Sequence, residues 1–317
     1  MTSSSDAGRP DVQNAKRQAD AAKRAAKKGI EEEAEPHATR KRYHRFDRIQ
    51  RLEHAALLIS FTVLSVTGLP QKYPDSWWGK GMLAAMGGIE MTRVIHHSAA
   101  VLLIAASIFH LLALGYRLWV QRAPATMMPG WRDVQDAIAT LSYDFGKRKL
   151  PPLMGHYNFG EKIEYWAVIW GTVIMVLTGF VLWNPILVTK YLPGQFVPAS
   201  KAAHGGEALL AVLSIITWHF YNVHLKHFNR SIFTGRISGE LMEEEHGREL
   251  EEIEDNTRKQ PNPSTRRRTI YVPIATVVGL LMLATVYFFL TYEDTAITTV
   301  PRQDVEIYVP AEATETP

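Results

Sequence analysis

Histidines at matched positions in two long apolar runs are the residues of this sequence best suited to chemistry. His96 and His110 lie 14 residues apart in one run, and His204 and His219 lie 15 residues apart in another. On an α-helix, 15 residues return a side chain to within about 60° of its starting direction and separate the two rings by roughly 22 Å. If the runs cross a membrane, the costly burial of these ionisable rings marks them as candidate functional residues at two depths.

Depth along the helices predicts how the histidines pair. His96 is level with His204 at one side of the membrane, whereas His54, at the start of an earlier apolar run, is level with His219 at the other. Two neutral imidazoles on opposite faces of the iron hold b-type haem without cysteine. We therefore expect two stacked haem b groups that carry electrons across the membrane. Zinc would more usually recruit three or four ligands at one level, and histidines that merely bond across helices need not match in depth.

Two further histidines leave the ligand sets open. His97 is adjacent to His96 and faces about 100° away, so only one of the two should point at the core of the bundle. His110 is level with His54 and lies about 40° from the direction of His96, so it competes with His54 as the ligand opposite His219. On spacing alone, the histidines of the second and fourth runs would reproduce the arrangement of cytochrome b in quinol:cytochrome c complexes.

Composition excludes several classes of function. The sequence of 317 residues contains no cysteine, which excludes disulfides, thiolate zinc sites, iron–sulfur clusters of its own and covalently attached c-type haem. Metal chemistry would therefore rest on the 12 histidines and on carboxylates. The net charge of +3, with no basic stripe of interleaved aromatic residues, indicates no nucleic-acid partner.

Five apolar runs are each near the 20 residues that a membrane-spanning helix requires. The runs cover roughly residues 51–70, 94–116, 163–183, 202–225 and 269–290. We therefore predict an all-α protein in which a membrane-spanning four-helix haem-binding bundle is followed by a fifth, C-terminal transmembrane helix. The expected parts of the chain are a charged, disordered tail (1–43), the di-haem bundle (44–240), a charged linker (241–268), the fifth helix (269–291) and a C-terminal tail (292–317). Within the linker, residues 243–254 are expected to form a charged surface helix without a chemical role.

The distribution of positive charge predicts the orientation of these helices. Of 35 lysines and arginines, 29 fall in the tail through residue 51 and in the segments 117–162 and 226–268. Positively charged segments are retained in the cytoplasm. We therefore expect a cytoplasmic N-terminus and linker, external loops at residues 71–93 and 184–201, and an external C-terminal tail.

Four segments of the sequence resemble the cytochrome b (gamma) subunit of formate dehydrogenases and related di-haem b subunits of bacterial respiratory oxidoreductases. In chain order, the segments are RIQRLEHAALLISFTVLSVTGLP, TRVIHH, GHYNFGEKIEYW and AAHGGEALLAVLSIITWHFY. The resemblance covers residues 43 to about 240 and implies a multi-pass protein of the bacterial inner (plasma) membrane, whose external side is the periplasm. It implies His54 and His219 as axial ligands of the cytoplasmic-side haem, and His96 and His204 as axial ligands of the external haem. His110 departs from the family pattern and remains an alternative ligand.

The resemblance also implies a quinone site beside the cytoplasmic-side haem, near Asn158 at the start of the third helix. Tyr157 and Glu161 flank this position, and quinone reduction needs protons that Glu161 or Glu164 would conduct from the cytoplasm. A compatible alternative is that Asn158 caps the helix while Glu161 makes the reciprocal capping-box bond. Glu207, inside the fourth helix, is expected either to relay protons or to accept a hydrogen bond from a histidine ring.

Basic residues at the ends of the spans are candidate partners of the haem propionates. Arg48 and Arg51 precede the inner haem, and Arg93 and Lys201 precede the outer one, where they would form charge-assisted hydrogen bonds. Arginines in such positions also anchor helices to lipid headgroups.

The function that we expect is that of a membrane cytochrome b subunit of a respiratory oxidoreductase. Two haem b groups would pass electrons between the quinone pool and an external iron–sulfur or multihaem cytochrome c subunit, to which a catalytic subunit is attached. No catalytic residue for a soluble substrate is expected in this chain. The alternatives are the cytochrome b subunit of a membrane hydrogenase, and a haem-free metal transporter or membrane anchor whose histidines bind zinc.

Overall fold

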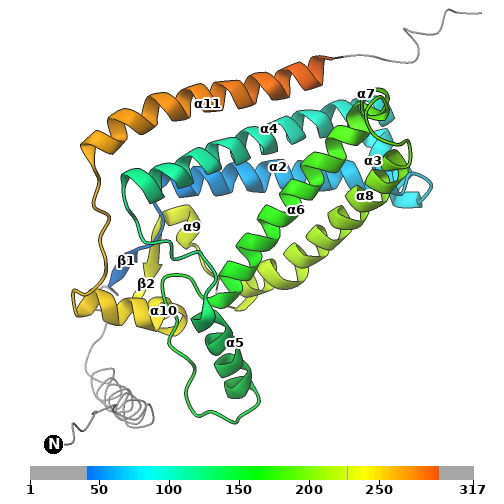
Figure 1. Ribbon diagram of the computed structural model, residues 1–317. Helices are drawn as coiled ribbons and strands as arrows, with labels where there is room; N and C mark the ends of the chain where they lie inside the picture. The colour runs from blue at the N-terminus through cyan, green and yellow to red at the C-terminus, as the bar shows by residue number, and fades with distance from the viewer. Residues whose placement is uncertain (1–40, 227, 293–317) are drawn as a thin grey trace, which may run out of the picture. The chain divides into compact units, whose positions relative to one another are not determined.

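The computed structural model describes residues 41–226 and 228–292 (Figure 1). The chain divides into two units, Met1–Tyr43 and His44–Pro317. Almost all of the first unit and of the expected C-terminal tail lies outside the described residues. The elements below therefore belong to the second unit, except for the start of strand β1 (Arg42–His44), which contains the boundary.

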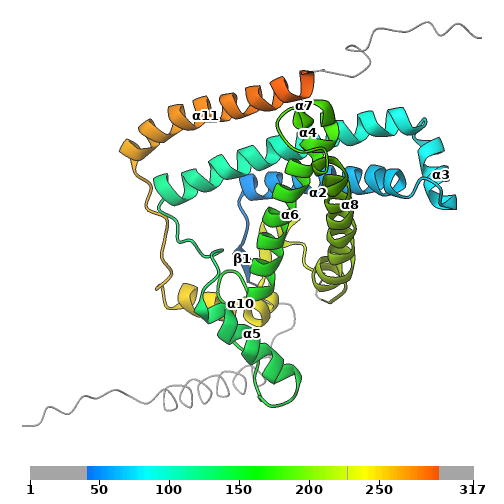
Figure 2. The ribbon, with the colours of Figure 1, turned by 45° about the vertical axis from the view of Figure 1, so that its right-hand side comes forward.

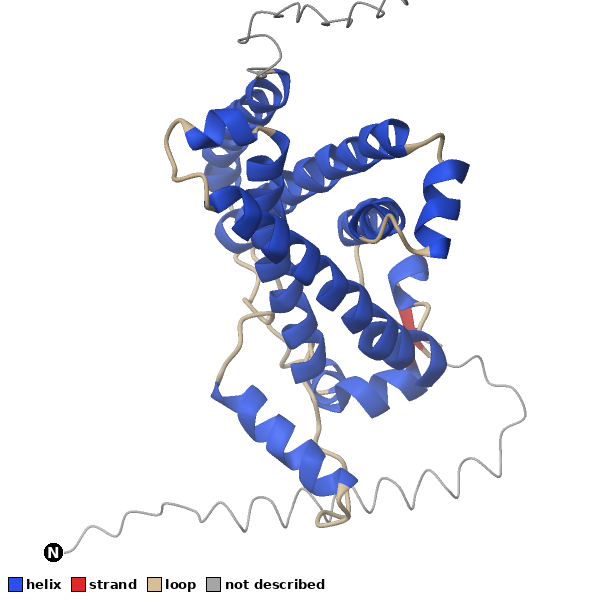
Figure 3. Ribbon diagram, turned by 90° about the vertical axis from the view of Figure 1, so that its right-hand side faces the viewer, coloured by secondary structure: helices blue, strands red, loops and turns tan. Residues whose placement is uncertain are grey.

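Helices dominate the described part of the chain, as the all-α prediction required (Figure 3). After β1, the elements are α2 (Arg48–Lys72), α3 (Trp77–Ala85), α4 (Ile89–Gly115), the π-helix η1 (Tyr116–Val120), α5 (Trp131–Asp144), α6 (Phe159–Trp183), α7 (Pro185–Thr189), α8 (Phe196–Ser214), the π-helices η2 (Ile215–His219) and η3 (Tyr221–Lys226), α9 (Ser231–Thr234), β2 (Arg236–Ser238), α10 (Gly239–Glu254) and α11 (Thr265–Thr291).

Within the described residues, five helices are long and apolar enough to cross a membrane, which confirms the predicted number. They cover Arg48–Lys72, Ile89–Val120, Phe159–Trp183, Phe196–Lys226 and Thr265–Thr291. Few of their side chains are buried within the protein, as expected of helices whose outer surfaces face lipid. The helices extend beyond the apolar runs because polar capping residues lie outside them.

Capping boxes start α2 and α6 and fix where these two spans begin. Asp47 Oδ1 accepts a hydrogen bond from the backbone N–H of Gln50 (2.8 Å), and Gln50 Oε1 accepts one from Asp47 N–H (3.0 Å). At the start of α6, Asn158 Oδ1 accepts from Glu161 N–H (2.8 Å), while Glu161 Oε2 accepts from Asn158 N–H (2.9 Å). The capping role predicted for Asn158 and Glu161 is therefore confirmed.

The bundle is built from two antiparallel helix pairs. α2 packs against α4, α6 packs against α8, and α2 also contacts α8, which joins the two pairs. We call the end of this bundle at which α2 and α6 begin the α10 end, and the opposite end, where α3 follows α2, the α3 end.

The fifth span, α11, lies beside α4 and η1 (Figures 1 and 2). Tyr271 donates a hydrogen bond from its hydroxyl to the backbone oxygen of Leu112 (2.7 Å), at the point where α4 changes to π-helical geometry. Gly115 permits this approach, because a Cβ atom there would lie 2.3 Å from the Tyr271 oxygen. α11 is thus attached to the bundle through a polar contact as well as apolar packing.

Helix α10 differs from the solvated surface helix that its charge predicted. The helix is present, but Met242, His246 and Glu249 are buried, and the backbone is kinked at His246 (φ −135°, ψ 36°). Its backbone is also tied to the loop before α6, because the N–H of Arg248 donates to the oxygen of Met154 (2.9 Å). The expected charged helix is therefore present, but one of its faces is buried beside the start of α6.

Candidate functional site

Two histidines from different helices face each other at the α3 end of the bundle. The ring centroids of His96 in α4 and His204 in α8 are 6.4 Å apart. Thr67 Oγ1 lies 2.9 Å from His96 Nδ1, and Thr178 Oγ1 lies 2.9 Å from His204 Nδ1. Each threonine hydroxyl also lies within hydrogen-bonding distance of a carbonyl in its own helix and donates its proton there, so its oxygen accepts from the imidazole N–H. This arrangement leaves Nε2 of both rings available as a ligand.

Each threonine is followed by a glycine, and the two Thr-Gly dipeptides contact the two histidine rings in the same way. A Cβ atom at Gly68 would lie 3.1 Å from His96 Cε1, and one at Gly179 would lie 3.5 Å from His204 Cε1. The dipeptides Thr67–Gly68 and Thr178–Gly179 therefore support the two rings from α2 and α6. Sequence reasoning missed both threonines; the signal that it overlooked was the repeated Thr-Gly dipeptide in two apolar runs.

A second pair of histidines faces each other at the α10 end. The ring centroids of His54 in α2 and His219 in η2 are 6.4 Å apart. Glu164 Oε2 accepts a hydrogen bond from His219 Nδ1 (2.8 Å), which again leaves Nε2 of the ring available. A π turn holds one additional residue. The π-helix η2 ends at His219, so this additional residue lies between His204 and His219. The distance along the helix that their 15-residue spacing spans is therefore closer to the distance that the 14-residue spacing of His96 and His110 spans.

The separation of the paired rings suits one metal ion between them. An imidazole nitrogen binds a metal at about 2 Å, so two imidazoles on opposite sides of one iron have ring centres about 6 Å apart. Both pairs meet this requirement. By contrast, no group of three or more histidine, aspartate or glutamate side chains that could hold a metal ion occurs within residues 41–226 and 228–292. The donor set therefore fits bis-histidine haem better than zinc.

The two alternative histidines have other partners. His110 Nε2 lies 2.9 Å from the hydroxyl of Tyr165, and His110 Nδ1 lies 3.5 Å from Glu53 Oε1. The ring of His97 stacks on Trp183, with centroids 3.6 Å apart and an angle of 17° between the planes. Neither ring faces a histidine of another helix among those described.

The basic residues expected near the haems differ in their contacts and in their exposure. Arg51 donates to the backbone oxygen of Phe233 in α9, Arg93 pairs with Glu90 (3.0 Å) on the surface, and Lys201 is exposed.

Lys72 is a basic side chain that sequence reasoning missed. It lies against Gly205, the residue after His204, because a Cβ atom at Gly205 would be 2.6 Å from Lys72 Nζ. A positive charge therefore lies beside the histidine pair of the α3 end. The only sequence signal was its place at the end of the first span.

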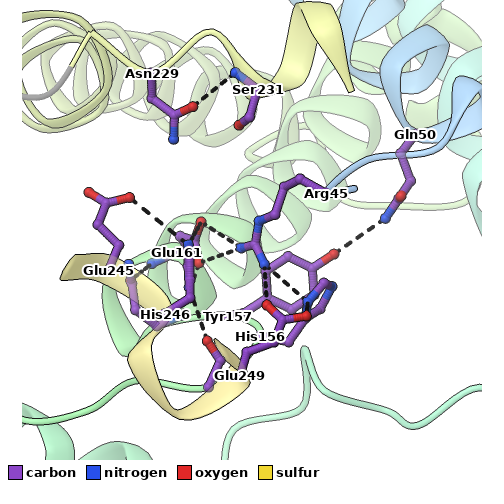
Figure 4. Close-up of polar contacts among 12 residues, drawn as sticks. Arg45, Gln50, His156, Tyr157, Glu161, Asn229, Ser231, Glu245, His246 and Glu249 are labelled. Carbon is purple, nitrogen blue, oxygen red and sulfur yellow. Dashed lines mark hydrogen bonds and ion pairs between the residues drawn. The ribbon is translucent and has the colours of Figure 1, made fainter. Parts of the chain in front are cut away.

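A cluster of buried charges lies at the α10 end, around Arg45 (Figure 4). The side chain of Arg45 is 1% exposed and donates to Glu249 of α10 (3.1 Å) and to Glu161 of α6 (3.3 Å). Its guanidinium group also lies over the ring of Tyr157, 5.1 Å from the centroid. His156 Nδ1 lies 2.6 Å from Glu249 Oε1, so this carboxylate has partners from two segments.

The residues expected at a quinone site meet at this cluster. The hydroxyl of Tyr157 accepts a hydrogen bond from Gln50 Nε2 (3.3 Å), and burial raises the pKa of Tyr157, so it remains a neutral phenol at pH 7. Gly160, between Asn158 and Glu161, approaches Trp218, since a Cβ atom at Gly160 would lie 3.7 Å from Trp218 Cζ2. Because Trp218 precedes His219, the start of α6 lies close to the histidine pair of the α10 end.

Glu207 does not bond to either histidine of the α3 end. The Nδ1 atoms of both rings are occupied by threonines, and a Cβ atom at Gly171 of α6 would lie 2.7 Å from Glu207 Oε1. The carboxylate thus lies against the backbone of α6.

Comparison with known proteins finds one family and several relatives to which this chain is similar. A family described as prokaryotic cytochrome b561 matches residues 8–130. The cytochrome b556(Fdn) subunit of the nitrate-inducible formate dehydrogenase of Escherichia coli K12 is 20% identical over 206 residues, which are 65% of this chain and 89% of the relative. The formate dehydrogenase cytochrome b556 subunit of Haemophilus influenzae is 24% identical over 202 residues, 62% of this chain and 78% of the relative. This chain resembles the cytochrome b subunits of formate dehydrogenases. The resemblance predicted from the sequence is thereby confirmed.

A second Escherichia coli K12 relative supports the same assignment. The cytochrome b556(fdo) subunit of formate dehydrogenase is 20% identical over 219 residues, 68% of this chain and 95% of the relative. The matches and the five apolar helices indicate a multi-pass bacterial membrane protein.

The Arg45 cluster also shifts the pKa of Glu249. Burial alone would raise the pKa of this carboxyl, but the hydrogen bond from His156 and the positive charges of Arg45 and Arg258 lower it below the usual value of 4.5. The ionised carboxylate therefore stabilises the fold above about pH 4.5, and this contribution is lost as the pH falls through the folded-state pKa.

We expect Glu249→Gln to destabilise the protein at pH 7 by about 3 kcal/mol, because the substitution removes one partner of a buried ion pair. Thermal unfolding of the purified protein in detergent, at pH 7 and at pH values below 4.5, measures this effect. The difference between wild type and variant should shrink at the acidic pH values. Glu254→Gln, an exposed position in the same helix, is the matched control. A difference that is the same at every pH would contradict the role of the ionised carboxylate.

Proposed function

We propose that this chain is the membrane subunit of a respiratory oxidoreductase and carries electrons through two haem b groups between an external redox subunit and the membrane quinone pool. The observation that carries the proposal is the pair of opposed imidazoles at each end of the bundle, both with centroids 6.4 Å apart. Bound haem would supply one-electron transfer, and its neighbour at the other depth would continue the path across the membrane.

The proposed ligands are His96 and His204 for the haem of the α3 end, and His54 and His219 for the haem of the α10 end. Hydrogen bonds from Nδ1 to a threonine or a glutamate support three of these assignments, because they fix the ring orientation and leave Nε2 for iron. His54 is preferred to His110 because the ring of His54 faces His219, whereas His110 is engaged by Tyr165 and Glu53.

We place the quinone at the α10 end, near Tyr157, Asn158 and Glu161. The support for this site is chemical: a neutral phenol, an amide and a carboxylate gather within reach of the histidine pair, and they can orient a quinone oxygen and exchange protons with it. The positive-charge distribution favours the cytoplasm for this end, so protons would be taken up from the cytoplasm.

The names of the relatives indicate which partner proteins this chain would bind. They are cytochrome b subunits of formate dehydrogenases, so we propose that the α3 end docks an external iron–sulfur or multihaem cytochrome subunit with its catalytic subunit. Lys72, Arg93 and Lys201 provide positive charge at this end, where haem propionates or an acidic partner surface would be stabilised. At the other end, Arg51 remains a candidate propionate partner.

We expect His54→Gln to lose the haem of the α10 end, so that the haem b content of the purified chain falls from about two to about one per polypeptide. His110→Gln is the matched comparison and should keep both haems. A pyridine haemochrome assay on the two variants makes the measurement. Loss of haem from the His110 variant, with full retention in the His54 variant, would assign the ligand to His110 instead.

Thr178→Val should raise the reduction potential of the haem of the α3 end. The hydrogen bond from His204 to Thr178 strengthens electron donation by the imidazole and so stabilises oxidised iron. Its loss, if worth about 1 kcal/mol, corresponds to a shift on the order of 50 mV for a one-electron couple.

Redox titration of the purified cytochrome would measure this shift. Thr276→Val is the control, because Thr276 makes the same bond to a carbonyl of its own helix (2.9 Å) and lies in α11, away from the histidine pairs. Equal potentials for wild type and the Thr178 variant would contradict the ring-orienting role.

A further inference from the structure

His246 is a buried histidine whose second ring nitrogen is unpaired within the described part of the chain. Its side chain is 1% exposed, and Nδ1 donates a hydrogen bond to the backbone oxygen of Gly155 (3.0 Å). In the neutral ring Nε2 therefore carries no proton, and Nε2 is buried without a hydrogen-bond partner. Such an atom is costly to bury, so it calls for an explanation.

Two carboxylates flank this nitrogen (Figure 4). Nε2 of His246 lies 3.9 Å from Glu161 Oε1 of α6 and 4.0 Å from Glu245 Oε2, its neighbour in α10. A ring nitrogen with a lone pair, placed between two carboxylates, is suited to hold one proton that any of the three groups can share. The distances are those of groups that come into contact after small side-chain rotations.

Burial and the charges around the site bring the pKa of Glu245 close to neutral pH. Burial, together with the negative charges of Glu161 and Glu244, raises the pKa of Glu245 to about 7, although Lys226 and Arg45 act in the opposite direction. Burial and Arg45 lower the pKa of His246, whereas Glu161, the Gly155 carbonyl and Glu249 oppose this shift. Near pH 7 the proton is therefore held by the carboxyl of Glu245, and the imidazole of His246 is neutral.

The three groups also connect helix α10 with the start of α6. Both carboxylates are partly exposed, Glu245 with 22% and Glu161 with 31% of its side chain accessible, and Glu161 also belongs to the capping box of Asn158 at the start of α6. His246 lies between them at the kink of α10.

We propose that Glu245 and His246 form a proton relay that takes protons from the solvent at the α10 end and passes them through Glu161 to the quinone site. This inference rests on the proposed function. Reduction of one quinone to a quinol consumes two electrons, which come singly from the haem at this end, and two protons, which come from solvent. Each proton moves from Glu245 to Nε2 of His246 and then to Glu161, and solvent reprotonates Glu245. The Nδ1–H bond to Gly155 is unchanged throughout.

The choice of substitution distinguishes the proton relay from a purely structural role of His246. His246→Asn can keep a donor to the Gly155 oxygen but has no group in the place of Nε2. Glu245→Gln removes the entry carboxylate at a partly exposed position and so provides a second variant if the Asn variant fails to fold. His44→Asn, an exposed histidine that precedes Arg45, is the matched control.

The first readout is independent of electron transfer. In a pH titration followed by infrared spectroscopy, the purified wild-type cytochrome should show a protonated carboxylic acid band that disappears with a midpoint near pH 7. We expect Glu245→Gln to abolish this band, His246→Asn to move its midpoint, and His44→Asn to leave it unchanged. A band that is the same in all variants would overturn the relay.

The second readout is the rate at which a short-chain quinone reoxidises the reduced haems, measured by stopped flow at several pH values. His246→Asn should slow this reaction at least tenfold and flatten its pH dependence, because the proton transfer is impaired. A folded His246 variant with both haems and the wild-type rate and pH profile would overturn the inference. Failure of quinone to reoxidise the haems of the wild type would instead refute the proposed function, while the infrared titration would still test the proton site.

Discussion

The fold depends on one constraint: imidazole rings from different helices must face each other, at a fixed separation, inside an apolar bundle. Nothing in lipid can satisfy a misdirected polar group, so each ring needs its own hydrogen-bond partner. Thr67 and Thr178 supply these partners at the α3 end, and Glu164 supplies one at the α10 end. The registers of α2 against α4 and of α6 against α8 follow from these contacts.

The two ends of the bundle differ in how they use charge. The α3 end combines neutral threonine contacts with scattered surface lysines and arginines, which suits a docked partner. The α10 end concentrates buried ion pairs around Arg45, which joins the segment before α2 to α6 and to α10. Removal of one partner from such a buried pair leaves an uncompensated charge, so these ion pairs hold the segment before α2, the start of α6 and α10 together beside the proposed quinone site.

Much of this arrangement follows from local sequence patterns, and the rest does not. Hydropathy predicted five spans, and the spacing of Asn158 and Glu161 predicted a capping box, because both properties depend on neighbouring residues. The burial of Glu249 was not predictable, because its partner Arg45 lies 204 residues away in the sequence. The π turn that ends at His219 was also not predictable, since no residue type specifies it. With uniform α-helical geometry, both His54 and His110 remained candidate ligands opposite His219.

The central claim is that each opposed pair of histidines holds one b-type haem. The most direct measurement is the haem b content of the purified wild-type chain, from a pyridine haemochrome assay combined with the dithionite-reduced spectrum. The account predicts two haem b groups per polypeptide. A folded, membrane-inserted protein without haem would contradict it and would make metal transport or membrane anchoring the better explanation of the paired histidines.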